Sequence, residues 1–250
     1  GLIFCHGWSG SRVGPHRMFV KAARHFAGLG YQVLRIDFRG RGNSEGLTSE
    51  AGIQSMIRDA EAACDWLGCS EGIRHVGLLG ICSGGKVAIG TATRWPRVEC
   101  LLLWSAEALG SLRHEQTNRR KTLGALRAYA GKLTRRATWR KLFRGGVDLK
   151  SVNKAVFRHE TRSDEEAAQE EIILDAFRGF RGPICFIYGG NDPDTRLAGR
   201  NYREFCRRCR IPAECHVIEE ANHSFYSLEW EKRVLSLSEE WLRREVRSVG

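Results

Sequence analysis

The sequence has no apolar run long enough to cross a membrane. Uninterrupted apolar stretches such as Val76–Cys82 and Leu101–Trp104 fall far short of the roughly 18 residues that a span requires, and no basic-then-apolar signal segment opens the chain. Proline is scarce, with 5 in 250 residues, whereas 28 glycines and 42% hydrophobic residues are ordinary for a globular protein. We therefore exclude predominant disorder and expect a soluble, unprocessed protein of one large domain or two small ones.

The chain also lacks the cysteine pattern of a disulfide framework. Its nine cysteines are odd in number and widely scattered, which favours reduced thiols and a cytoplasmic location. Cys206 and Cys209 have the spacing of half a zinc site, but no second pair accompanies them and Cys215 lies on an expected strand, so we expect no metal. An initial Met is missing too, and residues 2–5 already have the composition of a buried strand, so we expect a fragment without its upstream residues.

Acidic residues are scarce between Arg113 and Arg158. That segment holds fourteen Lys and Arg against two acids, a balance of +12 in a chain whose formal charge is +11. A basic segment in a neutral body suggests one element that meets an anion. Three interpretations stay open: a solvated helical face, recognition of an anionic substrate, and a membrane or nucleic-acid surface. Nothing in this segment resembles an aromatic-interleaved nucleic-acid platform, so we expect no nucleic-acid partner.

Short apolar runs alternate with longer helical patterns, which is typical of a mostly parallel sheet flanked by helices in an α/β fold. The expected strands are Gly1 to Cys5, Gln32 to Phe38, His75 to Ile81, Glu99 to Trp104, Ile184 to Tyr188 and Glu214 to Ile218. The expected helices are His16 to Leu29, Glu50 to Leu67, Gly84 to Arg94, Asp194 to Arg210 and Phe225 to Val246. Residues 106–180 have helical periodicity without a strand, and they hold the basic segment. We therefore expect a core of residues 1–105 and 181–250 with a basic helical cap of residues 106–180.

The strand-to-helix turn at residues 80–85 is the strongest chemical signal. A nucleophile on such a strained turn needs glycine two residues before and after it, because the helix passes close to the strand. Centring the turn on Cys82 places Gly80 and Gly84 at those positions, whereas centring it on Ser83 places a bulky isoleucine where a small residue is required. We therefore predict Cys82 as the nucleophile, with a buried and inert cysteine as the alternative.

Two further polar loops follow strands in a suitable order. Asp192 and Asp194 stand directly after an expected strand, and His223 follows the last one. In a parallel sheet these loops share the carboxyl edge with the Cys82 turn. Nucleophile, acid and histidine in this order are what a catalytic triad on such a fold requires. We predict His223 as the base, with a capping or surface histidine as the alternative, and Asp194 also suits the N-cap of the following helix.

The first expected strand ends in a glycine-rich loop, residues 6–10. Such a turn can aim the N–H of Trp8 at a developing oxyanion, beside the N–H of Ser83. We predict that His6 is structural rather than catalytic. The segment from Asp37 to Ser44 is predicted to be a rigid charged turn whose glycines allow tight packing.

Together these motifs resemble the α/β-hydrolase superfamily. The resemblance is carried by His6-Gly7, Asp37-x-Arg-Gly-x-Gly-x-Ser44, Gly80-x-Cys-x-Gly84, the acid loop at Asp192 and Asn222-His223. The segment around Asp37 is similar to the capped serine-aminopeptidase-like and monoacylglycerol-lipase-like branch. A cysteine in the nucleophile position resembles dienelactone hydrolases, whereas most members have serine. The resemblance covers nearly the whole chain, with the cap matched only in position, and it implies an eight-stranded sheet whose first two strands are absent here.

The resemblance also ranks the acids. Asp192 stands three residues after Gly189, at the position of the family's Gly-x-x-Asp loop, and is preferred. Asp194 and Glu107 are the reserves, the latter because some members of the superfamily place their acid after the adjacent strand.

We therefore expect a hydrolase that cleaves a carboxylic ester or thioester through an acyl-cysteine intermediate of a Cys82, His223 and Asp192 triad. This chemistry needs neither a metal nor an organic cofactor. The expected partner is a small-molecule acyl substrate, anionic if the basic cap binds it. The alternatives are an acyltransferase that uses the same acyl-enzyme and a non-catalytic small-molecule binding protein of the same fold.

Overall fold

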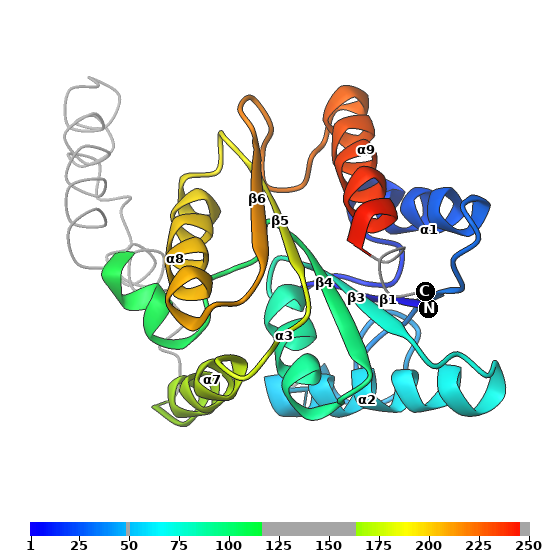
Figure 1. The fold of residues 1–250 in the computed structure, drawn as a ribbon. Helices are drawn as coiled ribbons and strands as arrows, with labels where there is room; N and C mark the ends of the chain where they lie inside the picture. The colour runs from blue at the N-terminus through cyan, green and yellow to red at the C-terminus, as the bar shows by residue number, and fades with distance from the viewer. Residues whose placement is uncertain (49–50, 117–163, 246–250) are drawn as a thin grey trace, which may run out of the picture.

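A parallel sheet organises the chain. The computed structural model describes residues 1–48, 51–116 and 164–245, which are coloured in Figure 1. Six strands pair in the order β2-β1-β3-β4-β5-β6, and every pairing is parallel. They are β1 (Leu2–Cys5), β2 (Val33–Arg35), β3 (Val76–Ile81), β4 (Val98–Trp104), β5 (Ile184–Gly189) and β6 (Ala213–Ile218). The predicted α/β architecture is confirmed.

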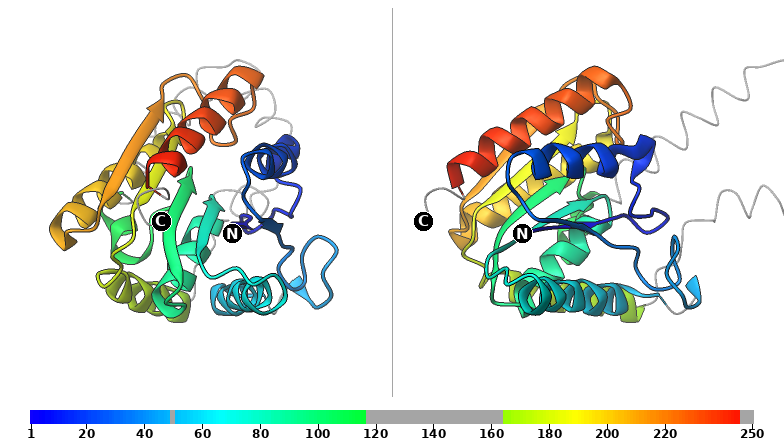
Figure 2. Two further views of the ribbon diagram at one scale, coloured as in Figure 1. Left: turned by 45° about the vertical axis from the view of Figure 1, so that its right-hand side comes forward. Right: turned by 90° about the vertical axis from the view of Figure 1, so that its right-hand side faces the viewer.

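Helices cover both faces of the sheet. Within the described residues they are α1 (Met18–Gly28), α2 (Ile53–Ser70), α3 (Gly84–Arg94), α7 (Asp164–Phe177), α8 (Pro193–Cys209) and α9 (Leu228–Glu245), with short 3-10 segments η1 (Pro15–Arg17) and η3 (Gly110–Gln116). Side chains of a strand alternate between faces, so Leu2 and Phe4 pack with α1 and α9, whereas Ile3 and Cys5 pack with α2 and α3. Figure 2 shows α1 and α9 on one side of the sheet and α2, α3 and α7 on the other.

The second strand is shorter than predicted. It ends at Arg35 instead of Phe38, and its three residues are only half-buried at the edge of the sheet. The N–H of Phe38 donates to Nε2 of His6 instead of to a neighbouring strand. This bond turns the chain away from the sheet and leads it into the charged turn that begins at Asp37.

Several helix ends also differ from the predictions, because the residues there are left-handed. His16 and Arg17 have φ values of 51° and 61°, so α1 begins only at Met18. Phe225 has a φ of 51°, which excludes it from the last helix. That helix, α9, begins at Leu228 instead of Phe225.

The predicted cap lies partly outside the described residues, because residues 117–163 carry most of it. The two ends of the cap that are described contact helices that cover the sheet. Ile173, Leu174 and Phe177 of α7 are buried in the same core as Val87 and Ile89 of α3. The division into a core and a 106–180 cap stays a prediction.

None of the helices in the described ranges combines the length and the apolar character that a membrane span needs. All nine cysteines lie within those ranges and are free thiols.

Candidate active site

The turn between β3 and α3 presents Cys82 at the carboxyl edge of the sheet. Its φ of 56° is left-handed, a strained conformation for a residue with a side chain. A Cβ on Gly80 would lie 2.6 Å from the carbonyl oxygen of Gly84, and a Cβ on Gly84 would lie 2.1 Å from that of Cys5. The close approach of helix and strand therefore requires both flanking glycines, as the spacing predicted.

Cys82 differs from the other thiols in its surroundings. Five cysteines are buried, namely Cys5, Cys64, Cys100, Cys185 and Cys206, and burial raises the pKa of each. A raised pKa leaves little thiolate, so these side chains are unreactive. Cys82 is half-buried and lies among polar groups.

His223 and Asp192 meet beside this turn. Nδ1 of His223 lies 2.5 Å from Oδ2 of Asp192. Hydrogen bonds with Asp192 and with Cys82 raise the pKa of His223 to about 10, against the opposing effect of burial. Burial disfavours the charge on Asp192, but hydrogen bonds from His223 and Thr195 hold its pKa below the ordinary value. His223 is thus hydrogen-bonded to the carboxylate of Asp192, and Cys82 is among the groups that raise its pKa.

Two glycines allow the acid loop and the histidine loop to touch. A Cβ on Gly189 would lie 2.4 Å from the carbonyl oxygen of Ala221, and a Cβ on Gly190 would lie 2.0 Å from that of Glu219. The Asn191 N–H donates to the Ala221 carbonyl at 3.0 Å, and the Asn191 side chain donates to Glu220 O at 2.9 Å. These contacts fix the distance between Asp192 and His223.

Glu107, the reserve acid, contacts the nucleophile rather than the histidine. The Cys82 thiol donates to Oε1 of Glu107 at 3.1 Å. The main chain of Glu107 is held on both sides, because its N–H donates to Cys82 O at 3.3 Å and its carbonyl accepts from the Tyr202 hydroxyl at 2.8 Å. Burial raises the pKa of Glu107, but Lys86, the Cys82 hydrogen bond and Arg113 outweigh it and hold the pKa below the ordinary value.

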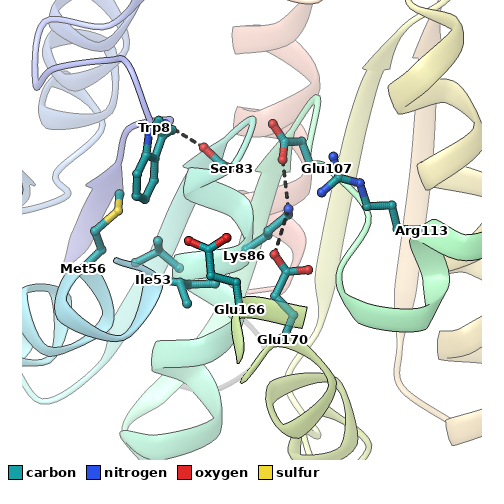
Figure 3. A pocket seen from close by; sticks show the side chains of 10 residues that line it. Trp8, Ile53, Met56, Ser83, Lys86, Glu107, Arg113, Glu166 and Glu170 are labelled. Atoms are coloured by element: carbon teal, nitrogen blue, oxygen red, sulfur yellow. Dashed lines mark hydrogen bonds and ion pairs between the residues drawn. The ribbon is translucent and has the colours of Figure 1, made fainter. Parts of the chain in front are cut away.

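A buried lysine explains the charge of Glu107. The ammonium of Lys86 lies 3.0 Å from Glu107 and 3.1 Å from Glu170 on α7 (Figure 3). Lys86 is 5% exposed, and Glu170 also accepts from the Gly110 N–H at 2.9 Å. Buried charges persist only when they are paired, so one cation here serves two carboxylates.

The predicted oxyanion donors, Trp8 and Ser83, lie next to each other. The Trp8 N–H donates to Oγ of Ser83 at 2.6 Å. The backbone N–H of Ser83, the N-cap of α3, donates no hydrogen bond within the described residues. His6 is buried with both ring nitrogens engaged, by Gly7 O at 2.8 Å and by the Phe38 N–H at 3.3 Å, and burial lowers its pKa. It is the neutral structural histidine that the sequence predicted.

A cavity of about 480 Å³ opens beside these groups. Apolar side chains of Trp8, Ile53 and Met56 form one side, and charged side chains form the other (Figure 3). The charged side consists of Lys86, Glu107, Arg113, Glu166 and Glu170. Such a cavity suits a ligand with an apolar part and a polar part.

One prediction on the acids was wrong. Asp194 was expected to cap the helix after β5, but that cap is Asp192, which accepts from the Thr195 N–H, and Asp194 lies inside α8. A helix begins one residue earlier when Pro can occupy its first position, as Pro193 does. The sequence interpretation also missed Lys86, whose signal was a lone charge in the otherwise uncharged start of a helix.

Comparison with known proteins agrees with this geometry. Residues 2–236 match the model of the "Alpha/beta hydrolase family". A lysophosphatidylserine lipase, ABHD12, of Xenopus tropicalis is 34% identical over 93 residues, which are 37% of this chain and 23% of that protein. The match thus spans about a quarter of the relative's length.

Solved structures share the fold. An esterase of Pyrococcus furiosus superposes with a TM-score of 0.66 at 21% identity, over 98% of this chain and 81% of the esterase. A monoacylglycerol lipase of Paleococcus ferrophilus superposes with a TM-score of 0.63 at 17% identity, over 96% of this chain and 93% of the lipase. The family match covers far more than half of the residues. The chain belongs to the alpha/beta hydrolase family.

Proposed function

We propose that the protein hydrolyses a carboxylic ester or thioester through an acyl-Cys82 intermediate. The observation that carries this proposal is the position of the Cys82 thiol, on a strained turn between His223 and Glu107 and next to the cavity. Named relatives support the substrate class, since they include a lysophosphatidylserine lipase, an esterase and a monoacylglycerol lipase. A lipid ester with one acyl chain is therefore the first substrate to test.

In the acylation step His223 takes the proton of the Cys82 thiol. Its raised pKa means that this proton rests on the imidazole at neutral pH, so the reactive form is a thiolate–imidazolium pair that Asp192 stabilises. The sulfur then bonds to the carbonyl carbon while the π electrons move to oxygen. The backbone N–H groups of Ser83 and Trp8 stabilise that oxyanion, once the Ser83 hydroxyl turns away from Trp8. Collapse restores the carbonyl and expels the alcohol or thiol, which receives the proton from His223.

In the deacylation step the same groups act on water. His223 removes a proton from water, and the hydroxide bonds to the acyl carbon. The carbon–sulfur bond breaks as the carbonyl reforms, and the sulfur regains its proton from His223. The released product is a carboxylic acid.

Glu107 has a different task in this scheme. Its carboxylate accepts the thiol hydrogen bond and so orients Cys82 before substrate arrives. The nearby ammonium of Lys86 balances the negative charge of Glu107, which would otherwise oppose a thiolate. Glu107 is thus a positioning residue at the nucleophile rather than the orienting acid at the histidine.

The decisive experiment incubates the protein with p-nitrophenyl esters and single-chain lipid esters and follows both product and protein mass. Hydrolysis gives free acid and a transient acyl adduct on Cys82. An acyltransferase gives the acylated acceptor when an alcohol or amine is added. If neither product nor adduct forms, the protein only binds its ligand, and the proposed hydrolysis is refuted.

A further inference from the structure

The charged side chain of Arg41 has no hydrogen-bond acceptor in the turn that contains it. The residue is 8% exposed, and its Nε and Nη2 atoms are buried without a hydrogen-bond partner among the described residues. Buried guanidinium nitrogens without acceptors are rare, because each keeps a desolvated donor unpaired.

The acid on the same turn, Asp37, already has other partners. Asp37 accepts from the backbone N–H groups of Arg12 and Asn43 at 2.5 and 3.0 Å, and the Arg12 guanidinium lies 3.5 Å from it. Arg39 on the same turn has its own partner, since it donates to Asp59 at 2.8 Å. Every other charged group of this turn is paired, so the isolation of Arg41 is specific to that residue.

Arg41 is nevertheless held in a defined place. Its guanidinium carbon lies 4.1 Å from the centre of the Trp8 ring, a cation–π contact. The backbone of Arg41 is fixed as well, because its N–H donates to Phe38 O at 3.0 Å and its carbonyl accepts from the Ser44 N–H at 3.0 Å. Stacking orients the guanidinium plane but provides no acceptor for its N–H groups.

Trp8 connects this cation to the catalytic site. The same residue lines the catalytic cavity and offers the backbone N–H that we assign to the oxyanion. Trp8 is 41% exposed, and because Arg41 does not itself line the cavity, the proposal requires the Trp8 side chain to move and uncover the Arg41 donors. A planar guanidinium matches the geometry of phosphate and carboxylate oxygens.

We infer that Arg41 binds an oxyanion, a phosphate or a carboxylate, at the Trp8 edge of the catalytic cavity. This inference rests on the proposed function in one respect: the oxyanion is the anionic group of the ester substrate. It does not depend on the basic segment predicted from the sequence, most of which lies outside the described residues.

The first test measures binding without catalysis. Inorganic phosphate is titrated into the full chain by calorimetry, with Arg41→Gln as the variant and Arg39→Gln as a matched control on the same turn. We expect phosphate to bind wild type and Arg39→Gln alike and to bind Arg41→Gln about tenfold or more weakly. Arg41→Lys keeps the charge without the planar fork and should fall between them. Equal binding by wild type and Arg41→Gln, or equal losses in both glutamine variants, would overturn the inference.

The second test asks whether the oxyanion belongs to the substrate. Rates are compared for a monoacylglycerol and for the lysophosphatidate with the same acyl chain. In Arg41→Gln we expect kcat/KM for the phosphorylated ester to fall about tenfold, mainly through KM, while that for the neutral ester stays within twofold. Equal losses for both esters would mean that Arg41 only supports the Trp8 loop, which refutes the inference and leaves the hydrolase standing. If wild type cleaves neither ester, the proposed function fails, and the phosphate titration still decides whether Arg41 binds an oxyanion.

Discussion

Two loops leave neighbouring strands at the same sheet edge, and each delivers a carboxylate to a different end of the Cys82 and His223 pair. After β5, Asp192 lies 2.5 Å from the histidine. After β4, Glu107 lies 3.1 Å from the thiol. Asp192 faces an imidazole whose charge changes during the proposed reaction, whereas Glu107 faces the permanent cation of Lys86. The end of a strand therefore does not by itself assign a role to a carboxylate, because its partners decide the role.

The two carboxylates also differ in what else they hold. The side chain of Asp192 caps α8 through the N–H and the hydroxyl of Thr195. Glu107 is tied to its surroundings by its main chain, through Cys82 and Tyr202. A side-chain substitution at Asp192 thus affects a helix end, whereas one at Glu107 leaves the backbone contacts in place.

The largest effect on turnover is expected from substitution of Cys82, which both loops serve. Cys82→Ala removes the atom that both loops serve, so turnover should fall about 10⁴-fold or more. Steady-state rates and acyl-adduct mass measure this loss. Cys69→Ser changes an exposed thiol on α2 and is the matched control, with no loss expected. A Cys82→Ala protein that keeps its activity would remove the thiol from the scheme altogether.

The second prediction compares the carboxylates directly. Asp192→Asn should lower kcat about 10³-fold or more, because an amide cannot stabilise the imidazolium, while Asn still caps the helix. Glu107→Gln should cost about tenfold or less, because Gln can still accept the thiol hydrogen bond. Asp194→Asn, at the reserve position inside α8, should be nearly silent. If Glu107→Gln were the more damaging change in kcat, the two roles would have to be exchanged.

The third prediction concerns the cation behind Glu107. Lys86→Met leaves the carboxylates of Glu107 and Glu170 near each other without their shared partner, and Lys86 is almost fully buried. Breaking a buried ion pair from one side costs about 3 kcal/mol, so urea unfolding should show a loss of that order. Adding Glu107→Gln to Lys86→Met should recover part of it. Asp192 has no Lys or Arg partner in the described residues, so its contribution to the free energy of unfolding comes from His223 and depends on pH.

The fourth prediction separates the carboxylates by pH. The pKa of His223 is raised from 6.5 to about 10 in the folded protein, so its contribution to stability is complete below pH 6.5 and is lost as the pH rises through about 10. Asp192→Asn should flatten this decline, because the first cause of the raised pKa is the bond to Asp192. Glu107→Gln should leave the decline in place. Unfolding midpoints between pH 6 and 10 test both statements, and a decline that is the same in wild type and Asp192→Asn would contradict them.

Local patterns explain why much of this site was predictable from the sequence. The glycines around Cys82 meet backbone atoms a few residues away or on the adjacent strand, so their spacing is visible along the chain. Asp192 and His223 follow strands, and the parallel sheet brings strand ends to one edge.

The parts that were not predictable depend on contacts between distant segments. Lys86 and Glu170 are 84 residues apart, and nothing in either sequence neighbourhood requires the other. The left-handed conformation of Phe225 and the N-cap at Asp192 are each set by the backbone of one residue, and the surrounding sequence has a helical pattern in both cases. Periodicity cannot resolve such choices, because a shift of one or two residues changes the apolar pattern very little.

The smallest effect is expected at Ser83, which follows the nucleophile but contacts neither carboxylate. Its hydroxyl accepts the Trp8 N–H at 2.6 Å, and its own backbone N–H is the other oxyanion donor that we propose. Ser83→Ala removes the hydroxyl and keeps that N–H, so kcat should change by no more than about threefold. Because the hydroxyl occupies the Trp8 donor, a small increase is as compatible with the scheme as a small decrease. A loss of more than about 100-fold in Ser83→Ala, together with little loss in Cys82→Ala and Glu107→Gln, would instead identify Ser83 as the nucleophile, since Glu107 would then serve a thiol that does not react.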